Sequence, residues 1–415
     1  MQTDLEPGFA ATPEGREAEA ILRACVHCGF CTATCPTYQL LGDELDGPRG
    51  RIYLIKQAME GGVVTARTQS HLDRCLSCRS CETTCPSGVR YGRLLDIGRA
   101  LVDGRVGRSL PSRVFRWGLR RVLPFPGRFG ALLRLGQWSR SLLPAPLRAQ
   151  VPPRQHPAPR PTRRHGRSML LLEGCAQSVA TPATNAATAR VLDRLGITLI
   201  SPPEQGCCGA VSHHLSAVEE GLGFMRRNID AWWPHIQAGA EAVLITASGC
   251  GAVVKEYGEL LKGDPAYAEK AARVAALARD LSEVLGGEDL SALGIDGAGR
   301  RVAFQSPCTL QHAQRLDGRV ESILRGLGFQ LTPVADPHLC CGSAGTYSIL
   351  QPRLSRQLLR NKLASLEAGD PELIVTANIG CQLHLQSGTA RPVRHWIELL
   401  DRDPGREDRR QRTGA

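Results

Sequence analysis

Two short cysteine runs constrain this chain more than any other feature of its sequence. Each run has the spacing Cys-x2-Cys-x2-Cys-x3-Cys followed by proline, and the eight residues are Cys25, Cys28, Cys31, Cys35, Cys75, Cys78, Cys81 and Cys85. Three thiolates at two-residue gaps let one tight loop bind three irons of a four-iron, four-sulfur cubane. The proline ends the loop, so the fourth cysteine points toward another cubane. The spacing therefore predicts two 4Fe-4S clusters in one unit.

The expected ligand sets are crossed between the two runs, because the last cysteine of each run serves the other run's cluster. The expected sets are Cys25, Cys28, Cys31 and Cys85 for cluster 1, and Cys35, Cys75, Cys78 and Cys81 for cluster 2. Between the runs lie 39 residues, more than a compact bacterial ferredoxin uses. This spacing resembles that of the iron-sulfur subunits of succinate dehydrogenase and favours a mainly helical ferredoxin domain.

Zinc is the main alternative metal, since it also binds four thiolates. Zinc sites usually show separated Cys-x2-Cys pairs rather than triplets followed by Cys-Pro, so we favour iron-sulfur clusters. His27 is expected to be a loop residue near the sulfurs rather than a ligand, because eight cysteines already complete both clusters. Two adjacent cubanes, each taking one electron at a time, would form an electron relay.

The cysteine content also bears on the expected compartment. The chain has 16 cysteines, and Met1 to Gly15 contain three acids and no apolar stretch typical of a secretory leader. We therefore expect a reducing cytoplasm, where clustered cysteines bind metals or act as thiols. No apolar run approaches the roughly 18 residues that cross a bilayer. The expected location is the cytoplasmic face of the inner membrane, in peripheral contact, or otherwise the cytoplasm.

The net charge of +11 is concentrated in one segment. Residues 105–167 contain 15 arginines, ten prolines and no acidic residue. The stretch Val114–Leu123 could form a basic amphipathic helix on anionic lipid, or the whole segment could be a solvated linker. Trp117 and Trp138 interleave with the arginines, which favours contact with a membrane surface or a partner. A zinc-bearing nucleic-acid binder is a further hypothesis, but the localised charge does not favour nucleic acid.

The remainder of the chain repeats itself. Cys175 is followed after 31 intervening residues by Cys207-Cys208-Gly209, and Cys308 after the same 31 by Cys340-Cys341-Gly342. Each repeat closes with one cysteine, Cys250 or Cys381, and Arg227-Asn228 in the first repeat matches Arg360-Asn361 in the second. Short apolar runs separated by helical lengths predict parallel strands at Met169–Leu172, Ile197–Ile200, Ala242–Ile245, Val302–Phe304, Phe329–Leu331 and Leu373–Val375. The cysteines would gather beyond the carboxyl ends of these strands.

The expected fold is α+β and multidomain, with a mainly helical ferredoxin-type domain followed by a duplicated α/β cysteine-rich region. Helices are expected at Arg51–Glu60 and Tyr91–Val102. The expected parts are the cluster-binding domain at residues 1–103, an Arg/Pro-rich connector at 104–167, unit 1 at 168–290, unit 2 at 300–400, and a charged tail at 401–415.

The two units resemble the cysteine-rich domain of heterodisulfide reductases, anaerobic glycerol-3-phosphate dehydrogenase and lactate- and glycolate-oxidising complexes. In heterodisulfide reductases such a unit uses five thiolates for a non-cubane cluster. Here Ala247 and Asn378 replace the fifth cysteine, so four thiols per unit remain. They could bind another cluster or metal, or the units could be structural. The neighbouring His213, His214, His312, His338 and His384 do not decide between these alternatives.

The N-terminal part resembles the iron-sulfur subunits of bacterial glycolate oxidases. The matching stretches are ILRACVHCGFCTATCPTYQLL (21–41), GDELDGPRGRIYLIK (42–56), residues 71–74 and ETTCPSGVRYGRLLD (82–96). The resemblance implies an electron-transferring subunit of a complex that oxidises glycolate to glyoxylate, with no substrate-binding or catalytic residue on this chain. It also implies two homologous partner subunits, at least one with FAD, and a quinone or other membrane acceptor. No Gly-x-Gly-x-x-Gly follows a predicted strand, which agrees with FAD on a partner. A lactate, glycerol-3-phosphate or heterodisulfide complex is the alternative.

Overall fold

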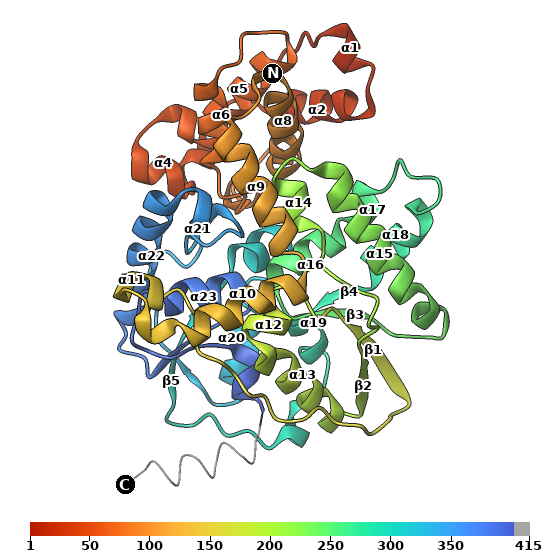
Figure 1. Ribbon diagram of the computed structural model, residues 1–415, viewed down its shortest axis with the longest axis vertical. Helices are drawn as coiled ribbons and strands as arrows, with labels where there is room; N and C mark the ends of the chain where they lie inside the picture. The colour runs from red at the N-terminus through yellow and green to blue at the C-terminus, as the bar shows by residue number, and fades with distance from the viewer. Residues whose placement is uncertain (402–415) are drawn as a thin grey trace.

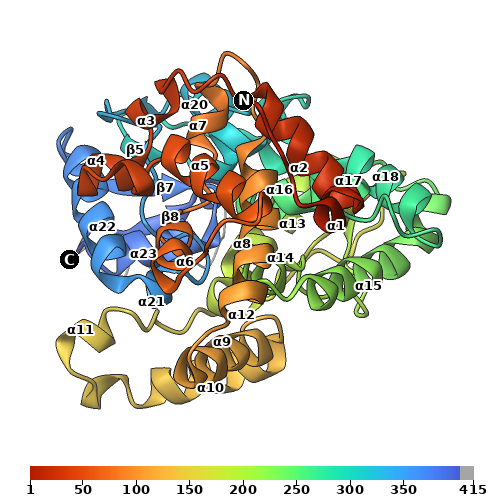
Figure 2. The ribbon, with the colours of Figure 1, turned by 90° about the horizontal axis from the view of Figure 1, so that it is seen from above.

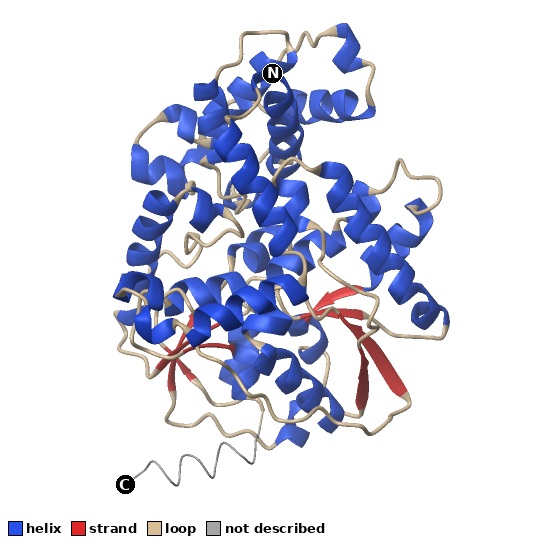
Figure 3. Ribbon diagram, viewed as in Figure 1, coloured by secondary structure: helices blue, strands red, loops and turns tan. Residues whose placement is uncertain are grey.

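The computed structural model describes residues 1–401 (Figure 1). Of the predicted charged tail, only Asp401 lies within this part. The predicted α+β class is confirmed, because the strands are confined to one end of the molecule and the other end is helical (Figure 3).

The N-terminal domain consists of short helices around one apolar core. Thr12 caps α2, its side chain accepting a hydrogen bond from Gly15, and Pro13 begins the helix. The predicted helices are present as α5 and α8, whose apolar faces bury Ile55 and Leu94. The elements are α1 (Pro7–Ala10), α2 (Pro13–Ala24), α3 (Phe30–Ala33), α4 (Pro36–Leu41), η1 (Glu44–Asp46), α5 (Pro48–Met59), α6 (Ala66–Asp73), α7 (Ser80–Thr83) and α8 (Tyr91–Val106).

The connector forms helices that lie along one side of the molecule (Figure 2). They are α9 (Leu110–Val122), α10 (Pro126–Trp138), η2 (Arg140–Leu142) and α11 (Ala145–Arg148). Arg116 and Arg120 of α9 form ion pairs with Asp73 and Glu220, which hold the helix against the N-terminal domain and unit 1.

Each cysteine-rich unit contains one four-stranded parallel sheet. The orders are β2-β1-β3-β4 in unit 1 and β6-β5-β7-β8 in unit 2, so the two sheets have the same topology. All six predicted strands are present, and β4 and β8 extend each sheet by one strand that we did not predict. The strands are β1 (Arg167–Leu171), β2 (Ile197–Ile200), β3 (Val243–Ile245), β4 (Ala278–Asp280), β5 (Arg301–Gln305), β6 (Gln330–Leu331), β7 (Leu373–Thr376) and β8 (Val393–His395).

Helices cover both faces of each sheet, as expected for parallel strands. In unit 1 they are α12 (Gln177–Ala180), α13 (Pro182–Arg194), α14 (Ala210–His214), α15 (Val218–Gln237), α16 (Ser248–Lys255), α17 (Tyr257–Leu260), α18 (Ala268–Leu277), α19 (Leu281–Leu285) and η3 (Leu290–Leu293). In unit 2 they are η4 (Thr309–Ala313), α20 (Arg319–Gly326), α21 (Tyr347–Leu350), α22 (Pro352–Glu367), α23 (Ile379–Gln386) and η5 (Trp396–Leu399).

The two units share one apolar core. Leu171 and Leu244 from the first sheet pack in the same buried cluster as Phe304 and Val375 from the second. Alternate residues of the strands, such as Val243, face separate cores on the opposite side. The units are therefore joined through one face of each sheet.

No helix within residues 1–401 is both long enough and apolar enough to cross a bilayer. This finding agrees with the sequence.

Candidate metal centres

Both cysteine runs adopt the same backbone shape. His27 and Ser77, two residues after the first cysteine of their runs, have φ values of 56° and 52°. Gly29 and Arg79, directly after the second cysteine, have φ values of 86° and 60°. In each run, a left-handed residue on either side of the second cysteine turns the chain tightly, which lets three thiols of one loop face the same volume.

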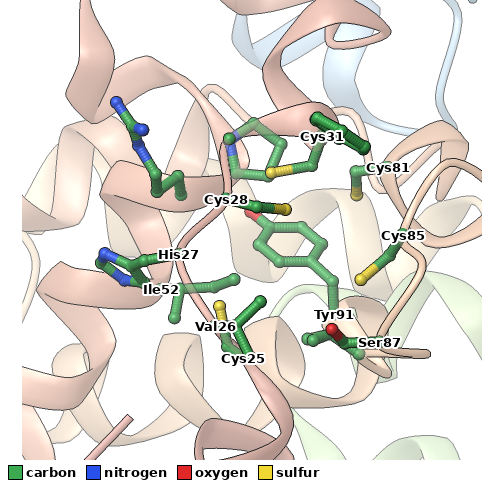
Figure 4. A pocket seen from close by; sticks show the side chains of 15 residues that line it. Cys25, Val26, His27, Cys28, Cys31, Ile52, Cys81, Cys85, Ser87 and Tyr91 are labelled. Atoms are coloured by element: carbon green, nitrogen blue, oxygen red, sulfur yellow. The ribbon is translucent and has the colours of Figure 1, made fainter.

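The four cysteines predicted for cluster 1 surround one cavity. Cys25, Cys28 and Cys31 of the first run and Cys85 of the second line it together (Figure 4). Cys81 also lines this cavity. Thiols from both runs thus line one volume.

His27 lines the same cavity. Its Nε2 atom is buried and has no hydrogen-bond partner among the described residues. Burial and the nearby Arg49 guanidinium lower the pKa of His27, so the imidazole is neutral at pH 7. Burial raises the pKa of the Cys31 thiol to about 11, so cluster assembly must displace its proton.

The four cysteines predicted for cluster 2 lie inside the molecule. Cys35, Cys75, Cys78 and Cys81 are each less than a tenth exposed. Burial, together with the neighbouring thiols, raises the pKa of Cys78 and Cys81 well above the usual value. The Cys35 sulfur lies 3.3 Å from the Thr37 hydroxyl, and the Tyr91 hydroxyl donates to the Cys75 sulfur over 3.6 Å.

A fully buried cation accompanies cluster 2. Arg51 is 0% exposed, and its guanidinium donates to the carbonyl of His71 and the hydroxyl of Thr37. Burial alone would lower the pKa of Arg51, but Cys75, Tyr91, Cys35 and Asp46 together raise it. Arg51 thus places a fixed positive charge beside two of the predicted cluster 2 ligands, which favours an anionic cluster there.

The thiols of each cysteine-rich unit also gather. In unit 2 the sulfurs of Cys308 and Cys340 are 3.9 Å apart, and those of Cys341 and Cys381 are 3.3 Å apart. In unit 1, Cys175, Cys207, Cys208 and Cys250 form the corresponding chain of sulfur contacts. A hydrogen bond with Cys207 and burial raise the pKa of Cys175 well above its usual value.

The described residues contain no compact group of three cysteine sulfurs, although two pairs of sulfurs approach closely in unit 2. Within residues 1–401, three ligand atoms approach within 4.8 Å of one another only in the groups Asp96, His213, His214 and Asp43, Asp46, His71. No three cysteine sulfurs are that close. Tetrahedral zinc with Zn–S bonds of about 2.3 Å holds its sulfurs roughly 3.8 Å apart. No set of three cysteine sulfurs within residues 1–401 is therefore spaced as a single zinc ion requires.

The N-terminal region with the two cysteine runs and the two later repeats each match a known protein family. The 4Fe-4S dicluster domain matches residues 21–89, and the cysteine-rich domain matches residues 169–255 and 302–386. The glycolate oxidase iron-sulfur subunit of Escherichia coli (strain K12) is 61% identical over 402 residues, covering 97% of this chain and 98% of that relative. The chain belongs to the glycolate oxidase iron-sulfur subunit family.

Other members and neighbours of this family are more distant. The probable glycolate oxidase iron-sulfur subunit of Bacillus subtilis (strain 168) is 32% identical over 409 residues, covering 91% of each chain. Lactate utilization protein A of Geobacillus kaustophilus is 32% identical over 228 residues, which cover 52% of this chain. The predicted pair of 4Fe-4S clusters is confirmed by the dicluster match. The residues that bind them stay predictions.

The histidines singled out in the sequence take part in contacts between the parts of the molecule or within unit 2. His312 Nδ1 is 2.9 Å from the Thr83 hydroxyl, and its Nε2 donates to the carbonyl of His338. His384 Nε2 is 3.1 Å from the hydroxyl of Ser355.

Sequence reasoning missed the partner of His213 and His214. Asp96 of α8 lies 3.1 Å from His214 Nδ1 and 3.9 Å from His213 Nδ1. Burial opposes ionisation of Asp96, but the two imidazoles hold its pKa well below the usual range. These residues join the N-terminal domain to unit 1. Because Asp96 and His214 are 118 positions apart in the sequence, no local pattern could indicate the contact.

Proposed function

We propose that this chain is the electron-transferring subunit of a flavin-dependent glycolate dehydrogenase. Cluster 1 would be bound by Cys25, Cys28, Cys31 and Cys85, and cluster 2 by Cys35, Cys75, Cys78 and Cys81. Each bound cluster supplies a one-electron redox centre. The observation that carries the proposal is one cavity lined by three cysteines of the first run together with Cys81 and Cys85 of the second.

The surface near cluster 1 supports a role in receiving electrons from a partner. Cys28 is exposed, and the adjacent Val26 and Phe30 are 68% and 61% exposed. An apolar rim beside an exposed cluster ligand is suited to docking of another subunit. We propose that the FAD-bearing subunit binds at this surface, and that a second homologous subunit completes the complex.

The experiment that tests this function uses the assembled complex. Cys28→Ser should reduce glycolate-dependent dye reduction to background while the complex still forms, because cluster 1 loses a ligand. Ser322→Ala, on the exposed side of α20, is the control and should retain full activity. L-lactate should not replace glycolate. Undiminished glycolate activity in Cys28→Ser, or failure to recover a flavoprotein with the tagged chain, would exclude the proposal.

We further propose that α9 and α10 contact the cytoplasmic face of the inner membrane, where a quinone accepts the electrons. Leu110, Val114, Phe115 and Trp117 of α9 are each at least half exposed, as are Leu132, Leu135 and Trp138 of α10. The segment is rich in arginine and contains no acid. Exposed aromatic and aliphatic groups among arginines are typical of helices that lie on anionic lipid.

A further inference from the structure

Units 1 and 2 have the same topology but different surroundings for their four thiols. A Cβ atom on Gly209 would lie 2.7 Å from the carbonyl oxygen of Gly221, and one on Gly342 would lie 2.6 Å from that of Ser355. Each glycine follows the cysteine pair of its unit and has a positive φ. Gly221 of α15 and Ser355 of α22 therefore occupy equivalent places.

The residue seven positions later in each helix faces the cysteine loop of its own unit. In unit 1 it is Asn228, whose amide donates to the carbonyl of Cys207. In unit 2 it is Lys362, whose ammonium donates to the carbonyls of Asp336 and Pro337, just before Cys340. The sequence match had paired Asn228 with Asn361, so the structure corrects that match by one residue.

Lys362 is buried, with only 4% of its surface exposed. Burial lowers the pKa of Lys362, whereas the thiols of Cys341, Cys340 and Cys308 act in the opposite direction. The ammonium group therefore lies within electrostatic range of the thiols of unit 2. The equivalent Asn228 is 0% exposed and carries no charge.

A second difference lies at the closing cysteine of each unit. Asn378 directly precedes α23. Its side-chain amide donates a hydrogen bond to the Cys381 sulfur over 3.6 Å. Its carbonyl oxygen accepts a hydrogen bond from the backbone of Gly249. The equivalent residue before α16 is Ala247, whose methyl group cannot donate to Cys250.

A third difference is contact with the dicluster domain. Cys78, a predicted ligand of cluster 2, packs in one buried group with Leu76 and with Cys340 and Tyr347 of unit 2. Cys308 packs against the same group. Two of the four thiols of unit 2, Cys308 and Cys340, therefore lie beside a predicted ligand of cluster 2.

These differences bear on the charge that each unit can bury. A cubane with four thiolate ligands is a net anion, and a buried anion is costly unless a cation or hydrogen-bond donors accompany it. Cluster 2 has Arg51 as its buried cation. Unit 2 has both Lys362 and Asn378, whereas unit 1 has Asn228 and Ala247 in their places.

We propose that unit 2 binds a third iron-sulfur cluster next to cluster 2, through Cys308, Cys340, Cys341 and Cys381, and that unit 1 binds none. Lys362 is a positioning residue that balances the charge of this cluster. The proposal extends the proposed electron relay, but it is tested by metal content and spectra without glycolate.

The test compares matched variants of the full-length chain purified without oxygen. The wild type should contain about twelve irons, four for each of three clusters. Cys341→Ser should contain about eight, whereas Cys208→Ser, at the equivalent place in unit 1, should keep about twelve. About eight irons in the wild type, or equal loss in both variants, would overturn the proposal.

A second comparison does not depend on removing a ligand. Lys362→Met should lower one of the three cluster reduction potentials, because the added electron is no longer stabilised by a nearby positive charge. The potentials are measured by redox titration followed by electron paramagnetic resonance. Lys362→Arg should restore that potential, and the other two should not move. Three unchanged potentials in Lys362→Met would overturn the role of Lys362. Loss of glycolate activity in Cys28→Ser does not depend on any of these results, so the proposed function is tested separately.

Discussion

At the scale of single residues, buried charge explains the surroundings of cluster 2. Asp46 is 1% exposed and lies between His71, Arg51 and Arg74, with the shortest separation, 2.8 Å, to Arg74. Arg51 also links α4 and α6 through the Thr37 hydroxyl and the His71 carbonyl. The same guanidinium thus contacts buried groups of the fold and lies near Cys75 and Cys35, two predicted ligands of cluster 2.

Arg51→Met should therefore be strongly destabilising. The substitution leaves the His71 carbonyl and the Thr37 hydroxyl without their hydrogen-bond donor and weakens the pairing of Asp46. Removing one partner of a buried ion pair typically costs about 3–5 kcal/mol of the free energy of unfolding. Arg49→Met is the control, since the Arg49–Glu44 pair is well exposed and should contribute no more than about 1 kcal/mol. Denaturant unfolding of both variants measures the difference, and similar midpoints would contradict this role of Arg51.

A second residue-scale prediction concerns acid stability. His395 is 0% exposed; its Nε2 donates to the carbonyl of Thr246 and its Nδ1 accepts from the backbone of Ile397, so the ring is held neutral. Burial lowers the pKa of His395 to about 4. The neutral ring thus stabilises the fold fully above the unfolded pKa of about 6.5, and this contribution falls away as pH drops toward 4.

The loss should reach about 3 kcal/mol below pH 4, because 2.5 pKa units correspond to that free energy. His395→Gln cannot gain a proton and should show a shallower decrease in the free energy of unfolding between pH 6.5 and 4. Parallel curves for the two proteins would show that another group is responsible.

At the scale of elements, residues 110–148 of the connector form a helical layer rather than an extended linker. Arg116 and Arg120 pair with acids of the main body, while Trp117 and Trp138 are 53% and 81% exposed. The two sides of the layer therefore differ in what they can bind.

Full-length protein should sediment with phosphatidylglycerol vesicles at low salt and less at high salt, since arginine–lipid attraction is screened. Replacing Trp117 and Trp138 together by alanine should weaken sedimentation without changing the fold. Replacing Trp233, which lies on α15 outside the connector, is the control. Equal sedimentation of wild type and the double variant would exclude membrane contact through these helices.

The elements that sequence could predict are those with a local pattern. Cysteine spacing predicts the cluster loops, and apolar runs such as Ile197–Ile200 predict six strands. β4 and β8 have only three residues each, including Arg279 and His395, so they show no apolar run. The cation partners of the thiols, Arg51 and Lys362, could not be predicted, because the contacts join residues on separate elements.

At the scale of the whole molecule, the N-terminal domain covers the cysteine loops of both units (Figure 1). Asp96 pairs with His214 on the unit 1 side, and Thr83 contacts His312 on the unit 2 side. In the proposed assignment, cluster 2 has one predicted ligand, Cys81, at the cavity of cluster 1 and another, Cys78, beside Cys308 and Cys340 of unit 2.

The crossed assignment is tested most directly by spectra of two matched variants, Cys35→Ser and Cys85→Ser. If the assignment is right, Cys85→Ser will alter the same paramagnetic resonance signal as Cys28→Ser, and Cys35→Ser the same signal as Cys78→Ser. If instead Cys85→Ser alters the signal affected by Cys78→Ser, each run binds its own cluster, and the crossed account is wrong.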